Sequence, residues 1–237
     1  LVSLHNVGRV FKDLGQYDRA LDHLHLAMKM SEKHKDAEGI AYSYDEIGDV
    51  QLRKNEFDSA LITLGLALKL TRQLHVNVLE PRIHSKLATI YLRKGDFPKA
   101  RAYYDSAFAL HDLTKDRFGA AEIELGRGMV YAKEGKYDEA LNKIESSLAV
   151  ALELNAHVLE IKCYNQLSAL WEMKGDYKKS LMYYKQYKQR EDTLFSQEMQ
   201  GKLLRDQLRF ETESRDSRIA FLSELQAIQR RENKKQE

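Results

Sequence analysis

The side chains of this chain that could do chemistry are eight histidines, one cysteine and a few neighbouring carboxylates. Two metal ligands on one helix must lie three or four residues apart to share a face. His23 and His25 are two residues apart, so they lie on different sides of a helix, and we expect no metal site. We interpret the remaining histidines, which are scattered and mostly near expected helix ends, as solvated or capping residues. These are His5, His34, His75, His84, His111 and His157.

The other reactive side chains also favour structural roles. Cys163 is the only cysteine, which excludes an internal disulfide and a zinc framework, and we interpret it as a buried small apolar residue. The carboxylate pairs Glu32/Asp36 and Glu122/Glu124 are interpreted as solvated helix faces. The sequence contains no glycine-rich phosphate loop, no His-Glu-x-x-His helix and no nucleophile elbow. We therefore predict that the protein is not an enzyme, with no catalytic residue, metal or cofactor.

The elements that would position a site follow from a repeat of 40 residues. In each copy a Gly or Asn is followed two residues later by an aromatic residue and five residues later by Ala or Ser. Gly and Asn enter the left-handed backbone region at low cost, so each marks a tight turn between two helices. These turn residues are Gly15, Asn55, Gly95, Gly135 and Gly175. Such a repeat predicts a solenoid, in which each unit buries its apolar face against its neighbours.

Apolar residues on both sides of the turn recur three and four apart, which is the helical period. In the first copy they predict helices over about residues 2–14 and 18–33, with small Gly8 and aromatic Phe11 in the first helix and large Leu24 and small Ala27 in the second. The small position recurs as Gly48, Ala88, Gly128 and Ser168, and the large one as Leu64, Tyr104, Ile144 and Tyr184. The aromatic position recurs as Tyr91, Tyr131 and Trp171, with Gln51 as the exception.

This order of small, aromatic, turn, Ala and large residues resembles the tetratricopeptide repeat over residues 1–187. The resemblance implies an all-α fold, a right-handed α-solenoid of five helix pairs. The period of 40 is longer than the usual repeat of about 34 residues. The proline that usually ends the repeat is absent, except that Pro81 could stand in the first turn of the next helix.

The remaining residues, 188–237, contain no turn signal and predict one long C-terminal helix. Gly201 would lower the stability of this helix by about 1 kcal/mol without ending it. Leu194, Met199 and neighbouring leucines could cap the last repeat, and apolar residues return from Ile219. The run from Asp206 to Leu222 resembles the connector helix of bacterial tetratricopeptide sensors. Two interpretations stay open, a capping helix with a frayed end and a coiled coil that forms a weak homodimer.

In the family that this chain resembles, the first helix of each unit lines a concave groove that binds another protein or a peptide. Here the groove is expected to alternate in charge, acidic in the second unit and basic in the third, and its amides can pair with a peptide backbone. Cochaperones of this family bind the C-terminal carboxylate of a partner with a clamp of basic residues. The acidic residues of the second unit would repel such a carboxylate. The predicted peptide-binding residues are Asn6, Arg9, Tyr42, Asp45, Asp49, Arg82, Lys86, Lys162 and Asn165.

Composition narrows the choice of partner. Charged residues make up 31% of the chain but the net charge is only +2, so we expect no nucleic-acid partner. The longest apolar run, residues 64–68, is too short to insert in a membrane, and without a signal peptide a cytoplasmic location is favoured. The favoured function is the sensory or interaction region of a larger bacterial signal-transduction protein. A free-standing adaptor and a peptide-responsive regulator are the alternatives.

Overall fold

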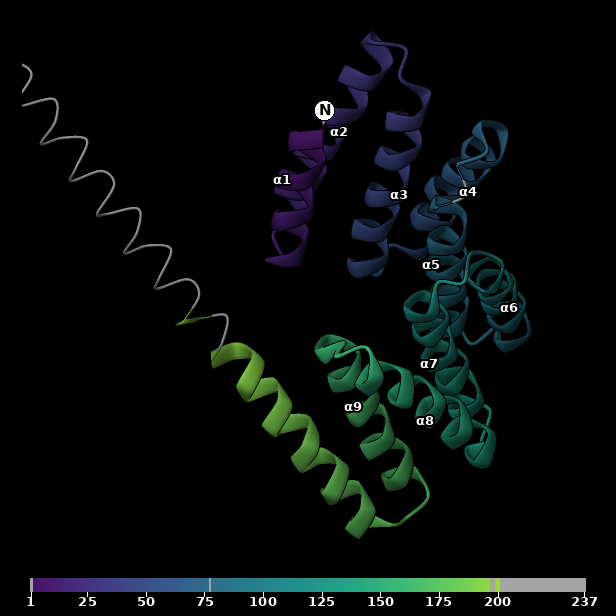
Figure 1. Ribbon diagram of the computed structural model, residues 1–237. Helices are drawn as coiled ribbons and strands as arrows, with labels where there is room; N and C mark the ends of the chain where they lie inside the picture. The colour runs from purple at the N-terminus through teal and green to yellow at the C-terminus, as the bar shows by residue number, and fades with distance from the viewer. Residues whose placement is uncertain (1, 77, 197–198, 201–237) are drawn as a thin grey trace, which may run out of the picture. The chain divides into compact units, whose positions relative to one another are not determined.

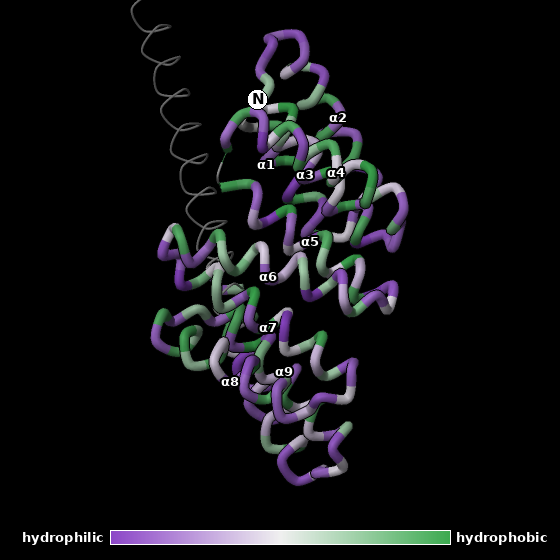
Figure 2. Tube along the Cα trace, turned by 90° about the vertical axis from the view of Figure 1, so that its right-hand side faces the viewer, coloured by the Kyte–Doolittle hydropathy of each residue, from purple (hydrophilic) through white to green (hydrophobic). Residues whose placement is uncertain are grey.

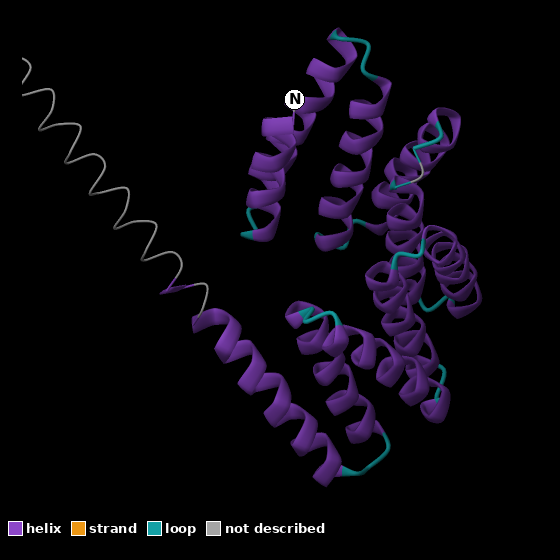
Figure 3. Cartoon of the chain, viewed as in Figure 1, coloured by secondary structure: helices purple, strands orange, loops and turns teal. Residues whose placement is uncertain are grey.

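The computed structural model describes residues 2–76, 78–196, 199 and 200, which form helices joined by short turns and no strand (Figures 1 and 3). The helices are α1 (Val2–Asp13), α2 (Tyr17–Lys33), α3 (Ala37–Arg53), α4 (Phe57–Leu74), α5 (Leu79–Lys94), α6 (Phe97–Thr114), α7 (Arg117–Lys133), α8 (Tyr137–Glu153) and α9 (His157–Met173). A further helix covers residues 177–196. Pro81 lies in the first turn of α5, as predicted.

The chain divides into two compact units, Leu1–Tyr184 and Lys185–Glu237. The first unit contains the repeats. In the second, residues 185–196 are helical, and the Tyr187 hydroxyl donates a hydrogen bond of 2.6 Å to Glu191. The predictions for Gly201 and for the apolar residues from Leu203 onward, including the connector and its dimerisation, lie outside the described residues.

In the repeat unit each helix packs against the next one along the chain, and each first helix also contacts the first helix of the following unit. The series α1, α3, α5, α7 and α9 therefore forms one continuous surface, with α2, α4, α6 and α8 behind it. Figure 2 shows apolar and polar residues alternating within the helices, as expected for helices with one buried side. The predicted all-α solenoid is confirmed.

Every described turn between consecutive helices has one residue in the left-handed region. Gly15, Gly95, Gly135 and Gly175 have φ between 72° and 78° and Asn55 has φ of 62°, which confirms the predicted turns inside the units. A second series joins one unit to the next, and the sequence did not predict it: Lys35, His75, Lys115 and Asn155, with φ between 52° and 57°. Left-handed residues thus recur every 20 positions, so the 40-residue unit consists of two halves of equal length.

The small residues of the first helices permit close packing within a unit. A Cβ on Gly48 would lie 2.6 Å from Leu64 Cγ, and one on Gly128 would lie 2.5 Å from Ile144 Cγ1. In the fifth unit the small residue is a serine, and the Ser168 hydroxyl donates a hydrogen bond of 3.0 Å to the Ser180 carbonyl. The contacts at Gly48 and Gly128 show that the two helices of a unit approach each other closely at the small positions.

Candidate protein-interaction surface

Two open hollows lie along the surface formed by the first helices. The first has a volume of about 450 Å³ and lies between α1, α3 and Arg82 of α5. The second has a volume of about 580 Å³ and is lined mainly by residues of α5 and α7. Both are concave and larger than a single amino-acid side chain, so they can receive side chains of a bound segment.

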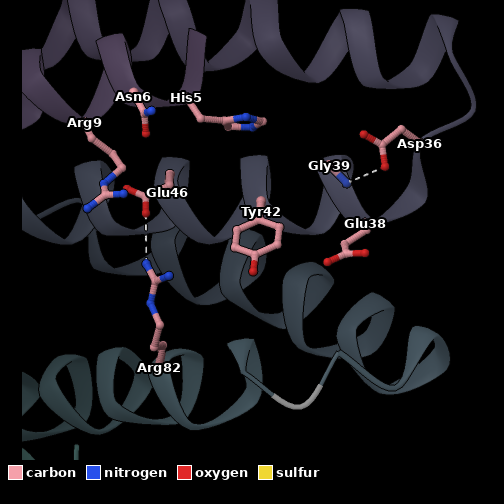
Figure 4. A pocket seen from close by; sticks show the side chains of 9 residues that line it. All are labelled: His5, Asn6, Arg9, Asp36, Glu38, Gly39, Tyr42, Glu46 and Arg82. Atoms are coloured by element: carbon pink, nitrogen blue, oxygen red, sulfur yellow. Dashed lines mark hydrogen bonds and ion pairs between the residues drawn. The ribbon is translucent and has the colours of Figure 1, made fainter. Parts of the chain in front are cut away.

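The residues that line the first hollow are mainly polar or charged (Figure 4). α1 contributes His5, Asn6 and Arg9, and the His5 ring lies 2.8 Å from the Ser43 hydroxyl. Asp36 is committed to capping α3, because it accepts a hydrogen bond of 2.9 Å from the Gly39 amide. The other lining residues are Glu38, Tyr42, Glu46 and Arg82.

The second hollow has both apolar and charged residues in its lining. Its lining includes Phe118, Leu125 and Met129, with Lys86 and Lys162 among its charged residues. Lys162 pairs with Glu122 at 3.1 Å across α7 and α9. A partner side chain that enters this hollow would therefore meet apolar surface with paired charges around it.

A chain of ion pairs joins the first three of these helices. Lys12 of α1 lies 2.7 Å from Glu46 and 2.6 Å from Asp49 of α3. Arg82 of α5 lies 2.9 Å from Glu46, and Lys86 of α5 lies 2.7 Å from Asp45, whose side chain is 0% exposed. Arg82 also pairs with Asp45 at 3.1 Å. The acidic second unit and the basic third unit thus neutralise each other within the chain.

Burial and ion pairing have opposite effects on the pKa values of the charged groups in this network. Burial of the Lys12 ammonium lowers its pKa, but Asp49 and Glu46 outweigh this effect and raise the pKa above its usual value. Burial likewise raises the pKa of Glu46 and Asp49, but Lys86 and Lys12 hold the pKa of both carboxyls below the usual value. All three groups therefore stay charged at neutral pH.

The predicted site residues fall into three groups. Asn6, Arg9, Tyr42 and Arg82 line the first hollow, and Asp49, Arg82, Lys86 and Lys162 line the second. Asp45 is buried beneath Arg82 and Lys86, and Asn165 is exposed on α9 and lines neither hollow.

Sequence reasoning missed Lys12 and Phe118. For Lys12 a signal existed, because its counterparts one, two and three units later are Leu52, Leu92 and Ala132, so a cation at this position needs an acidic partner.

Two interpretations of titratable residues were wrong. His84 is neither solvated nor capping, because it is buried in α5 beside Tyr103 and burial lowers its pKa. Glu124 is buried rather than solvated, and it pairs with Arg127 and Lys143. Cys163 is buried as predicted, and burial raises the pKa of its thiol to about 11.

Within the described residues no three His, Cys, Asp or Glu side chains come together as a metal site. Over the same residues, no helix is long and apolar enough to cross a membrane.

Comparisons with solved structures show the fold. The structure of BtubC (BKLC) from P. vanneervenii has a TM-score of 0.64 at 19% identity, covering 81% of this chain and 79% of that one. A Rap protein complexed with Competence and Sporulation Factor has a TM-score of 0.63 at 17% identity, covering 82% and 64%. A Signal Transduction ATPase with Numerous Domains with a tetratricopeptide repeat sensor, from Pyrococcus horikoshii, has a TM-score of 0.62 at 17% identity, covering 77% and 28%.

Sequence comparisons agree. Protein KINESIN LIGHT CHAIN-RELATED 3 of Arabidopsis thaliana is 24% identical over 183 residues, which cover 73% of this chain and 28% of that protein. This chain therefore spans less than a third of the length of that relative. A family model for the tetratricopeptide repeat matches residues 1–73 and 119–190, and a second matches residues 46–111. Since these matches cover most of its length, the chain belongs to the tetratricopeptide repeat family.

Proposed function

We propose that the repeat unit holds a segment of another protein, extended or helical, in the groove along α1, α3, α5 and α7, and that it converts no substrate. The observation that carries this proposal is the row of two hollows on the continuous surface of the first helices. Tetratricopeptide repeat proteins are protein-interaction modules, and this chain is one of them. A segment lying along this surface could place one side chain in each hollow.

The ion pairs within the chain indicate which side chains are available to contact the bound segment. Asp45, Arg82 and Lys86 already have partners inside the protein, so we assign Asp45 to holding the two cations in place rather than to contacting the ligand. Arg9 of the first hollow has no ion pair with any described residue, and it lies beside Asn6 and Tyr42. In the second hollow Met129 and Phe118 offer apolar contact. Recognition would thus combine polar contacts at Arg9 with apolar burial at Met129.

The wider role that we propose is that of the sensory or interaction region of a larger bacterial signal-transduction protein, with residues 188–237 as its connector. Two likenesses support it, to a Rap protein complexed with Competence and Sporulation Factor and to an ATPase with a tetratricopeptide repeat sensor. The resemblance of residues 206–222 to sensor connectors also favours it. An adaptor or a peptide-responsive regulator would use the same groove. The full-length gene product discriminates, since only the first role requires an output module.

A selection experiment tests the groove without a known ligand. Peptides are selected from a display library on the immobilised 237-residue chain, and their affinities are then measured for Met129→Glu and Ile62→Asp. Ile62 lies on α4, is 69% exposed and lines neither hollow, so it controls for a carboxylate introduced elsewhere on the surface. We expect Met129→Glu to weaken binding by about 1–3 kcal/mol and Ile62→Asp to leave it unchanged.

Peptides that bind Met129→Glu as tightly as the native chain would overturn the groove assignment. Arg82→Glu is a poorer test, because it leaves the buried Asp45 and Glu46 carboxylates facing a negative charge and lowers stability.

A further inference from the structure

The lining of the second hollow has a glycine where the other units have a polar side chain. This residue is Gly126 of α7, and a glycine in the interior of a helix is destabilising relative to alanine. The counterparts of Gly126 in the other units are Asn6, Glu46, Lys86 and Gln166. The fourth unit therefore leaves space in the groove at the position where the other units have a long polar residue.

Tyr104 of α6 explains why this position is a glycine. Its counterparts in the first, second and fourth units are the shorter residues Leu24, Leu64 and Ile144. A Cβ on Gly126 would lie 2.5 Å from Cε1 and Cζ of the Tyr104 ring. Tyr104 is only 4% exposed, yet it belongs to the lining of the second hollow. The glycine thus allows a buried tyrosine to reach the groove.

The Tyr104 hydroxyl can accept a hydrogen bond that no described residue donates. Tyr104 Oη lies 3.1 Å from Thr89 Oγ1, and Thr89 Oγ1 donates its single proton to the Ser85 carbonyl at 2.9 Å. Tyr104 must therefore be the donor to Thr89, and its own oxygen keeps its acceptor capacity. Burial raises the pKa of Tyr104, so this group stays a neutral phenol at neutral pH.

The rest of the lining favours an aromatic ring as the occupant. Leu125 and Met129 offer apolar surface, and the sulfur of methionine makes favourable contacts with rings. Arg82, Lys86 and Lys162 also line the hollow, and cations are attracted to the face of a ring but repel another cation. A volume of about 580 Å³ lies within the range of pockets that bind small molecules.

We infer that this hollow receives an aromatic side chain that carries an N–H or O–H group, a tryptophan or a tyrosine of the bound segment, and that Tyr104 Oη accepts the hydrogen bond from that group. The inference rests on the proposed function, since it names the side chain by which the segment is held. The ring would pack on Leu125 and Met129 beside Gly126. Leucine or phenylalanine would bury apolar surface but leave the buried Tyr104 oxygen without a donor.

Small probes test this inference without a known partner. The chain has six methionines, so its methionine methyl NMR spectrum is simple, and the Met129 signal is assigned with Met129→Leu. N-acetyltryptophanamide should shift this signal in a saturable manner. Its analogue methylated at the indole nitrogen should bind about three- to tenfold more weakly, because it has no N–H to donate. N-acetylleucinamide should bind more weakly than N-acetyltryptophanamide.

Tyr104→Phe keeps the ring but removes the acceptor. This variant should bind the two indole probes with equal affinity. Tyr103→Phe is the matched control, since Tyr103 precedes Tyr104 on α6 and lines neither hollow, and it should keep the native preference. Circular dichroism melting checks that both variants are folded.

Two results with the probes overturn the inference as a whole. They are a Met129 signal that no probe shifts and equal binding of the tryptophan and leucine probes. The role of Tyr104 is wrong if the native chain binds both indole probes equally, or if Tyr104→Phe keeps the preference.

Peptides selected on the groove separate this inference from the proposed function. Those that Met129→Glu weakens should share a Trp or Tyr, and its replacement by Ala should weaken binding by at least about tenfold. If these peptides bind without any aromatic residue, the inference is wrong while the groove assignment stands. If the tryptophan probe binds as expected but no peptide does, the proposed function fails and the ring site stands.

Discussion

Lys12 determines how the first two units are joined. At this position the next three units have Leu, Leu and Ala, so apolar packing is the usual solution. A buried ammonium is costly unless it is paired, and Lys12 is paired with both Glu46 and Asp49. At this position the first junction of the solenoid therefore depends on ion pairs, whereas the next three units have an apolar residue.

This dependence predicts a specific pH response. The pKa values of Glu46 and Asp49 are lowered in the folded state, so the stability they contribute is complete above their unfolded pKa values and is lost as the pH falls through the lower folded values. Lys12→Met should reduce the free energy of unfolding by about 3 kcal/mol at neutral pH, because it leaves the acids less well paired. It should also reduce the loss of stability between about pH 5 and pH 2.

Urea unfolding over this pH range measures both effects. The matched control is Lys29→Met, since Lys29 is exposed on α2. The pairing argument fails if Lys12→Met and the control lose stability in acid to the same extent as the native chain. The raised pKa of Lys12 adds a separate alkaline effect, a contribution present below its usual value of 10.5 and lost as the pH rises through the higher folded value.

At the scale of the elements, every described turn uses the same hydrogen bonds. The amide after the left-handed residue donates to the carbonyl five positions earlier, as Gln16 does to Phe11 and Asp116 does to His111. This is the Schellman arrangement, and it needs a left-handed residue whatever its type. Lys35, His75 and Lys115 adopt it without the freedom of glycine, so the turns between units carry strain that most of the turns inside units do not.

Lys115→Gly should therefore stabilise the protein. Glycine removes the strain of the left-handed lysine, which costs about 1–2 kcal/mol. This effect is larger than the entropic cost of ordering glycine, which has more conformational freedom in the unfolded chain. We therefore expect the free energy of unfolding to rise by roughly 0.5–1 kcal/mol. Asn155→Gly is the control and should gain less, because Asn tolerates the left-handed region. Chemical unfolding monitored by circular dichroism measures both. A native-like or lower stability of Lys115→Gly would show that this turn is not strained.

For the whole repeat unit, stability is a sum of contacts between neighbours, and the terminal helices have fewer neighbours than the central ones. Amide hydrogen exchange should consequently be slowest in α5 and α6 and fastest in α1 and residues 177–184. Uniform protection from α1 to residue 184 would mean that the array opens only as a whole.

The sequence by itself determined the order of helices in this protein, the turns inside each unit and the family. The positions of Gly8, Gly15 and Leu24 recur every 40 residues with residues of similar kind, and a local pattern repeated five times predicts a solenoid. The turn at Lys115 was not predictable, because lysine has no preference for a left-handed backbone and the hydrogen bonds of the helix end impose it.

Only the tertiary structure decided which polar residues face a partner. The sequence placed Asp45, Arg82 and Lys86 on the groove side of their helices, but it could not show that they pair with each other, because the pairs join residues 36–41 positions apart. Burial of His84 and Glu124 likewise depends on neighbouring helices. Distances between side chains of different units are set by how the units stack, and this stacking appears in no local stretch of the sequence.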